Sequence, residues 1–94
     1  MNFKEYLLAR HGIKSGAKRM KAVSAEQYEN RLENLRKKKI YNEEAEITDH
    51  IVKLIDRTYV NKTNEYERTL RYYIEYKKYS GQAIEFLVYP EFRH

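Results

Sequence analysis

Apolar residues recur every three or four positions in four stretches of the chain, a spacing typical of amphipathic helices. The clearest stretch is 24–40, in which Ser24 and Gln27 have the spacing of a capping box. We therefore expect a helix that begins at Ser24 and ends by residue 41. Its apolar face comprises Ala25, Tyr28, Leu32 and Leu35.

The same reasoning predicts three further helices. Asn2 is the expected N-cap of the first helix and Gly12 its stop. Asn42 is the expected N-cap of the third helix, with Thr48 as an alternative start. The three expected helices cover residues 2–10, 43–58 and 63–80.

The expected helix 63–80, which should stop at Gly81, is apolar on two sides. Residues 82–94 are the most apolar run and fit either a short helix or a strand, with Pro90 ending either one. We favour a packed tail with a short helical turn that covers the second side. The first side carries Tyr66, Leu70, Tyr73 and Ile74, and the second carries Tyr72, Tyr76 and Tyr79.

These patterns predict an all-α fold. The chain has 94 residues, which is the size of one small domain, and the sequence shows no internal repeat and no linker. We therefore expect residues 1–94 to form a single domain. We expect a small four-helix orthogonal bundle with a short apolar C-terminal tail.

Charge is distributed unevenly along the chain. The net charge is +5, but residues 1–41 hold eleven Lys and Arg against four Asp and Glu, whereas residues 42–94 hold eight against ten. A positive field over one half favours an anionic partner such as a nucleic acid. The absence of cysteine is consistent with a location in the reducing cytoplasm. The apolar runs are too short to form a membrane-spanning helix.

The sequence shows no set of residues that suggests catalysis. The three histidines, His11, His50 and His94, are far apart, and none has a helical metal-binding partner. Consecutive carboxylates point away from each other on a helix, so they do not suggest acid–base chemistry. We therefore expect a protein that is not an enzyme, with no metal, no cofactor and no small-molecule substrate.

The remaining chemistry is cationic and aromatic, and it suits duplex DNA. Lys and Arg neutralise phosphates, and tyrosine hydroxyls bind them. Sequence preference would come from Arg31, Arg68 or Arg71 at base edges. The candidate DNA-binding residues are Lys14, Lys18, Arg19, Lys21, Arg31, Arg36, Lys37, Lys38, Lys39, Arg68 and Arg71.

Two motifs resemble the core-binding domain of tyrosine recombinases, the phage-type integrases. The first is S-x-x-x-Y-x-x-x-L, and the second is N-x-x-x-x-x-L-R-x-Y-I-x-Y. The resemblance implies a SAM-like helical domain that grips duplex DNA. Because the chain ends at His94 without a catalytic domain, we expect no recombinase activity from this chain alone, and we expect either a stand-alone derivative in a phage or other mobile element or an excised domain. The matching residues are Ser24, Tyr28 and Leu32, then Asn64, Leu70, Arg71, Tyr73, Ile74 and Tyr76.

An alternative is a small phage-type regulatory module that binds a recombinase, a repressor or a host enzyme. It would use the tyrosine-rich helix and the C-terminal tail, which could also form a homodimer contact. RNA is a third candidate partner, since charge alone does not distinguish the nucleic acids. The residues of this protein-interaction surface would be Tyr72, Tyr76, Tyr79 and Phe86.

Overall fold

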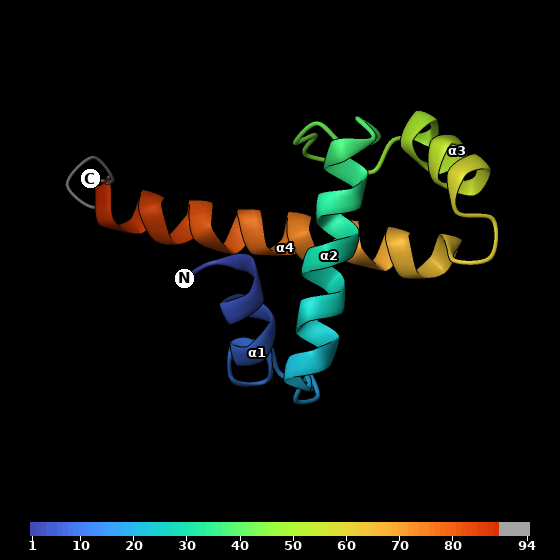
Figure 1. Ribbon diagram of the computed structural model, residues 1–94. Helices are drawn as coiled ribbons and strands as arrows, with labels where there is room; N and C mark the ends of the chain where they lie inside the picture. Colours follow the sequence, from blue (N-terminus) through green and yellow to red (C-terminus); the bar gives the residue numbers. More distant parts are fainter. Residues whose placement is uncertain (89–94) are drawn as a thin grey trace.

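Helix α4 (Thr63–Val88) is the longest element and contacts all three of the other helices (Figure 1). The computed structural model describes the backbone of residues 1–88 and the side chains of residues 1–81. Within that part, α1 (Phe3–Ile13), α2 (Ala22–Lys37) and α3 (Asp49–Thr58) complete an all-helical fold without strands. The predicted all-α, four-helix class is therefore confirmed.

Helix α4 is crossed by α2 rather than aligned with it (Figure 1). Figure 1 shows α2 crossing over α4, with α1 beside the N-terminal half of α2. Helix α3 packs against α4 alone among the described helices. Within residues 1–88, α4 therefore has two contact regions. Helices α1 and α2 pack on its middle, and α3 packs near its start.

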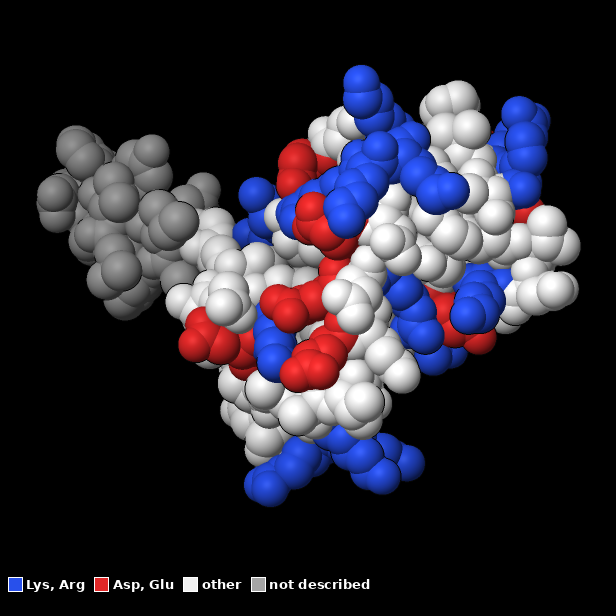
Figure 2. Space-filling view, in the orientation of Figure 1, with Lys and Arg blue, Asp and Glu red and all other residues white. Residues whose placement is uncertain are grey.

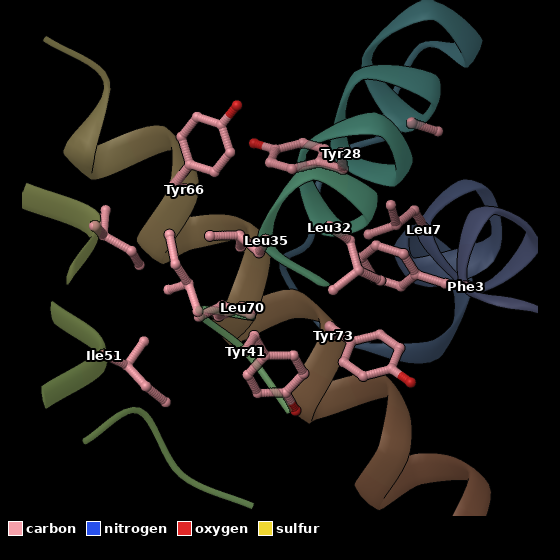
Figure 3. Packing of buried hydrophobic residues seen from close by; sticks show 13 residues of the cluster. Phe3, Leu7, Tyr28, Leu32, Leu35, Tyr41, Ile51, Tyr66, Leu70 and Tyr73 are labelled. Atoms are coloured by element: carbon pink, nitrogen blue, oxygen red, sulfur yellow. The ribbon is translucent and has the colours of Figure 1, made fainter. Parts of the chain in front are cut away.

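The core lies where these helices meet (Figure 3). Leu35, Ile51, Ile55 and Leu70 are fully buried, and each comes from the apolar stripe that the sequence predicts for its helix. Thr69 is the buried polar residue of this region, and its hydroxyl donates to the Glu65 carbonyl at 2.8 Å. The remaining core residues are Phe3, Leu7, Ala25, Tyr28, Leu32, Ile40, Tyr41, Tyr66 and Tyr73.

Aromatic rings form a connected network between α1 and α4. The Tyr6 ring lies 5.3 Å from the Tyr79 ring and 5.5 Å from the Tyr76 ring, centroid to centroid. The Tyr76 ring lies 5.9 Å from the Tyr73 ring, which meets Tyr41 at a further 5.9 Å. Such offset and edge-on arrangements stabilise a core beyond the area that they bury. This tyrosine network holds α1 on α4.

Helices α1 and α2 differ from their predicted limits. Gly12 does not end α1, which continues to Ile13, while Gly16 takes the left-handed φ of 83° that turns the chain. Ser24 does not cap α2, because the helix begins at Ala22. The N–H of Ala25 already bonds to the carbonyl of Lys21, so Ser24 lies within the first turn.

The start of α3 follows the alternative prediction. Thr48 is the N-cap, and its hydroxyl accepts from the Ile51 N–H at 3.2 Å. Asn42 does not cap a helix, because its side-chain N–H donates to the Lys39 carbonyl and the next residue, Glu43, has a left-handed φ of 65°. Residues 38–48 are therefore a loop, which is fixed by the buried side chains of Ile40 and Tyr41.

Helix α4 extends further than predicted. It passes through Gly81 without interruption and continues to Val88, so the helical alternative for residues 82–88 is correct and the strand alternative is wrong. Pro90 and the rest of 89–94 lie outside the described residues, as does the side chain of Phe86. No helix in the described part of the chain has the length and apolar character that a membrane span requires.

Candidate nucleic-acid interface

One group of cations lies at the N-terminal end of α2. Lys18, Arg19 and Lys21 are exposed, and none forms an ion pair with an Asp or Glu of the described residues. We call these three residues the loop cluster. Lys21 is the N-cap of α2 and makes no side-chain capping bond, so the positive end of the helix dipole adds to this charge.

Lys14 differs from the other cations of its segment. Its ammonium lies 2.8 Å from a carboxylate oxygen of Glu75, although the side chain stays 49% exposed. The sequence places Lys14 in the same basic segment as the loop cluster, but the structure neutralises it with α4. The Lys14 side chain therefore stabilises the contact between α1 and α4.

A second group of cations lies at the C-terminal end of α2. Lys37, Lys38 and Lys39 are exposed, and no Asp or Glu of residues 1–81 pairs with them. The helix ends here in a Schellman motif, in which the Ile40 N–H bonds to the Leu35 carbonyl and Lys39 takes a left-handed φ of 57°. We call Lys37, Lys38 and Lys39 the helix-end cluster.

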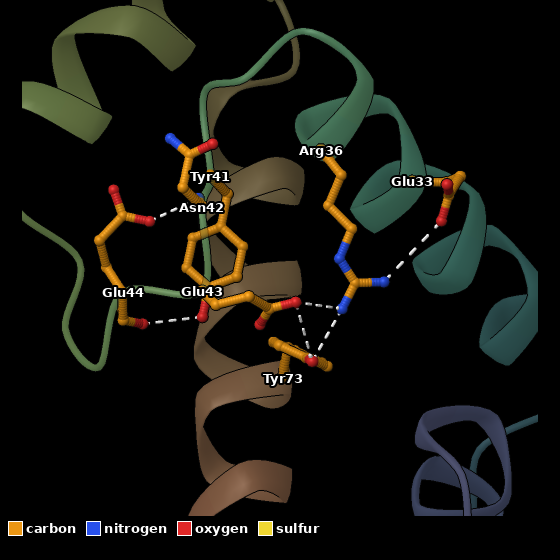
Figure 4. Close-up of polar contacts among 7 residues, drawn as sticks. All are labelled: Glu33, Arg36, Tyr41, Asn42, Glu43, Glu44 and Tyr73. Atoms are coloured by element: carbon orange, nitrogen blue, oxygen red, sulfur yellow. Dashed lines mark hydrogen bonds and ion pairs between the residues drawn. The ribbon is translucent and has the colours of Figure 1, made fainter.

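Arg36 does not belong with that cluster, contrary to the sequence prediction. Its guanidinium lies 2.8 Å from Glu43 and donates to the Tyr73 hydroxyl at 2.7 Å, with Glu33 at 3.8 Å (Figure 4). Burial alone would lower the pKa of Arg36, but the hydrogen bond to Glu43 and the interactions with Tyr73 and Glu33 together outweigh burial, so the pKa is raised. Arg36 therefore fixes the 38–48 loop to α2 and α4.

The two cationic clusters lie at opposite ends of α2, separated by roughly 24 Å for its sixteen residues. Figure 2 shows Lys and Arg at the top and at the bottom of the view, and the largest group of Asp and Glu lies between them, left of the centre. The sequence predicts a single cationic surface, whereas the structure gives two separate cationic clusters.

The sides of α2 between the clusters differ in chemistry. The acidic flank, Glu26, Glu29 and Glu33, faces α1, and Glu26 pairs with Lys4 of α1 at 3.0 Å. The other side has side chains with hydrogen-bonding groups and no carboxylate, and their spacing of three and four places them in one row. We call this row the polar stripe; it comprises Ser24, Gln27, Arg31, Asn34 and Lys38.

The polar stripe contains residues that charge counting misses. Gln27 and Asn34 are uncharged and exposed, and only their spacing from Arg31 indicates that they share its face. Asn34 uses one side-chain N–H to donate to the Tyr66 hydroxyl at 3.2 Å. Gln, Asn and Arg are the side chains that form bidentate contacts with adenine and guanine edges.

Arg31 is held by aromatic neighbours rather than by acids. Its guanidinium lies 5.4 Å from the centroid of the Tyr28 ring, and Tyr28 meets Tyr72 of α4 edge-on at 5.1 Å. Arg10 of α1 lies over the other ring, 4.8 Å from the Tyr72 centroid. The contact with Tyr28 orients Arg31, and no Asp or Glu within residues 1–81 forms an ion pair with it.

The other two predicted base-reading arginines lie in different places. Arg68 is exposed near Tyr28, and its hydrogen bond to the Tyr28 hydroxyl, which accepts it, is the main cause that raises the pKa of Arg68. Arg71 is exposed too, but it lines a groove to which α2 contributes no residue. The structure therefore places Arg68 beside the polar stripe and separates Arg71 from it.

Within residues 1–81, α1 and α2 contact the second tyrosine side of α4, and the predicted cover by the tail lies outside the described side chains. Tyr72 packs against Tyr28, and Tyr76 packs against Tyr6 and donates to the Met1 carbonyl at 2.8 Å. Tyr79 is 37% exposed. Tyr72 and Tyr76 therefore form intramolecular contacts, Tyr79 stays exposed, and the side chain of Phe86, the fourth residue of the protein-interaction alternative, lies outside the described residues.

No group of three His, Asp or Glu side chains in the described residues is arranged to hold a metal ion. Comparisons of the chain with protein-family models, with curated proteins and with solved structures found no match. The resemblance to tyrosine recombinases therefore stays a prediction that rests on the motif residues.

Proposed function

We propose that this chain binds duplex DNA through α2, with the polar stripe in the major groove. The observation that carries the proposal is a carboxylate-free row of Gln, Arg and Asn between two unpaired cationic clusters. The major groove is about 12 Å wide and admits an α-helix. Because α2 is roughly twice that length, its ends extend to the sugar–phosphate backbones on either side.

The two clusters have the role of phosphate contacts in this proposal. Lys18, Arg19 and Lys21 add their charge to the N-terminal N–H groups of α2, which suits a phosphate. The helix-end cluster supplies the same charge at the other end. Arg31, with Gln27 and Asn34 beside it, would contact base edges. Lys14 and Arg36 are left out because acids already neutralise them, and Arg71 because it lies elsewhere.

The proposed role is binding without catalysis, in the cytoplasm. Origin in a phage or mobile element stays a prediction from the motif resemblance. The protein-interaction alternative loses support at Tyr72 and Tyr76, because these rings pack against α1 and α2, whereas Tyr79 stays exposed. Double-stranded RNA is less suitable than DNA, because its major groove is too deep and narrow for a helix.

Fluorescence anisotropy with a labelled 20-base-pair random duplex, at 50 and 200 mM salt, tests the proposal. Six phosphate contacts predict a slope of about −5 in log K against log salt, so affinity should fall by about a thousandfold. Replacing the loop cluster with alanine should reduce the magnitude of that slope by about 2.7. The control Lys53→Ala/Lys62→Ala removes two exposed cations outside α2 and should change the slope little.

A second variant tests the base contacts. Gln27→Ala/Asn34→Ala should leave the salt slope unchanged and reduce the spread of affinities over a panel of duplex sequences. Absence of binding to any duplex at 50 mM salt would overturn the proposal. Equal binding of double-stranded RNA would contradict the placement of α2 in a major groove.

A further inference from the structure

A groove of about 610 Å³ lies on the side of α4 that α2 does not cover. One wall comes from the end of α1, at Ile13 and Lys14, and the other comes from residues 45–47 of the α2–α3 loop. The floor belongs to α4. We call this feature the α4 groove. Its volume is that of a ligand site, and no residue of the polar stripe lines it.

The floor of the α4 groove alternates in chemistry along one helix face. Arg71, Ile74 and Lys78 follow each other at spacings of three and four, so they form one row with an apolar residue between two cations. The seven-residue separation places the two cations roughly 10 Å apart. Ile13 and Ile47 are half-buried like Ile74, so three isoleucines leave apolar surface in the groove.

The charges of the groove leave these two cations uncompensated. Glu75 also lines the groove, but Lys14, Arg10 and Tyr6 already bind its carboxylate. Glu46 is the other acid of the lining; it belongs to the loop wall, forms no ion pair with a residue of 1–81, and so places one negative charge opposite the two cations of the floor. Arg71 and Lys78 are exposed and unpaired within residues 1–81, so the floor is positive around an apolar centre.

We propose that the α4 groove binds an acidic amphipathic helix of a partner protein. A helix with two carboxylates seven residues apart matches the spacing of Arg71 and Lys78, since both follow the same helical rise. Leucine or isoleucine residues between those carboxylates would contact Ile74 and the isoleucines of the walls. This is helix-in-groove recognition with complementary charge at both ends.

The inference does not depend on DNA binding. The polar stripe and the loop cluster contribute no residue to the α4 groove, so a duplex on α2 and a helix on α4 occupy different surfaces. The apolar centre makes the groove unsuitable for nucleic acid, because phosphates gain nothing from three isoleucines. The two partners should therefore bind at the same time.

The test uses the full chain and a synthetic 18-residue helical peptide with two Glu seven residues apart and Leu at the positions between them. A second peptide carries Lys in place of both Glu. Methyl spectra of the ¹³C-labelled protein follow the Ile13, Ile47 and Ile74 signals during titration. We expect these signals to shift with the Glu peptide and to shift little with the Lys peptide.

Charge reversal tests the role of the two cations. Arg71→Glu/Lys78→Glu should weaken the Glu peptide by about tenfold or more and should strengthen the Lys peptide. The matched control, Lys53→Glu/Lys62→Glu, makes the same change of charge at exposed positions outside the groove and should preserve the preference for Glu. All four positions are exposed, and circular dichroism verifies that each variant is folded.

Several results would overturn the inference. One is that the isoleucine signals stay unchanged at millimolar peptide. Another is that the two double variants change peptide affinity equally. A third is that the groove signals respond to a 20-base-pair duplex and not to the peptide. A protein that binds the peptide but no duplex would retain this inference and lose the proposed DNA function. A protein that binds duplex without groove shifts from the peptide would do the reverse.

Discussion

The Tyr6 hydroxyl donates a 2.6 Å hydrogen bond to Glu75 Oε2, and this bond joins α1 to α4. The same carboxylate binds Arg10 at 2.6 Å and Lys14 at 2.8 Å. Burial would raise the pKa of Glu75, but the bonds from Arg10, Lys14 and Tyr6 outweigh it and lower the pKa to about 2. One acid therefore holds three residues of α1 and of the segment after it.

Loss of the Glu75 charge should destabilise the protein. Its folded pKa is about 2 and its ordinary value 4.5, so its contribution is complete above pH 4.5 and disappears as the pH falls toward 2. Glu75→Gln should lower the free energy of unfolding by roughly 1 to 3 kcal/mol at pH 7. Urea unfolding from pH 7 to pH 2 would show the difference shrinking below pH 4.5, and a constant difference would contradict the assignment.

Arg36 and the neighbouring lysines should respond differently to alanine. Arg36→Ala removes the bonds to Glu43 and Tyr73, so thermal unfolding should show a loss of about 1 kcal/mol. Lys37→Ala/Lys38→Ala should change stability by no more than about 0.5 kcal/mol and should weaken duplex binding, with a smaller salt slope. The opposite pattern would mean that Arg36 is the DNA contact.

Lys39 occupies a backbone position that favours glycine. Its φ of 57° lies in the left-handed region, and it is the residue that completes the Schellman motif. Lys39→Gly should therefore raise the free energy of unfolding by about 0.5 to 1 kcal/mol. Lys37→Gly loses the same charge inside α2 and should lower it by about 1 kcal/mol, so equal effects would point to charge rather than backbone.

Tyr59 carries a buried hydroxyl with no hydrogen-bond partner among the described residues. Its ring stacks on the Tyr66 ring with centroids 3.7 Å apart. The ring therefore contributes packing, whereas the hydroxyl contributes no hydrogen bond. Tyr59→Phe should be neutral or should stabilise by up to about 1 kcal/mol in chemical unfolding. Tyr66→Phe, which removes the bond with Asn34, is the matched comparison and should destabilise.

Apolar periodicity predicts the four helices, because burial of one face determines each of them. Helix limits depend on finer balances. Ser24 has the sequence of a cap, yet the helix gains a further backbone bond by starting earlier, at Ala22. Gly12 is the second-to-last residue of α1, so the helix ends one residue after the glycine instead of at it.

The candidate interface was predictable in its residue types and not in its arrangement. A list of Lys and Arg does not reveal that Glu75 and Glu43 neutralise Lys14 and Arg36, because these pairs join elements far apart in sequence. The position of Arg71 likewise depends on which side of α4 the other helices cover. Gln27 could have been found from its spacing to Arg31, but net charge gives no sign of it.

The tyrosine network described above also gives the molecule an optical property. Rings that lie 5.3 to 5.9 Å apart exchange electronic excitation, so light absorbed by one tyrosine is shared with its neighbours on both α1 and α4. Emission from the folded protein should therefore lose polarisation even when the molecule tumbles slowly. Separation of α1 would remove Tyr6 from that exchange and would leave Tyr79 without its contact to the network, whereas Tyr73 would stay beside Tyr41 and Tyr76. Opening of α1 should therefore reduce the loss of polarisation in the unlabelled protein.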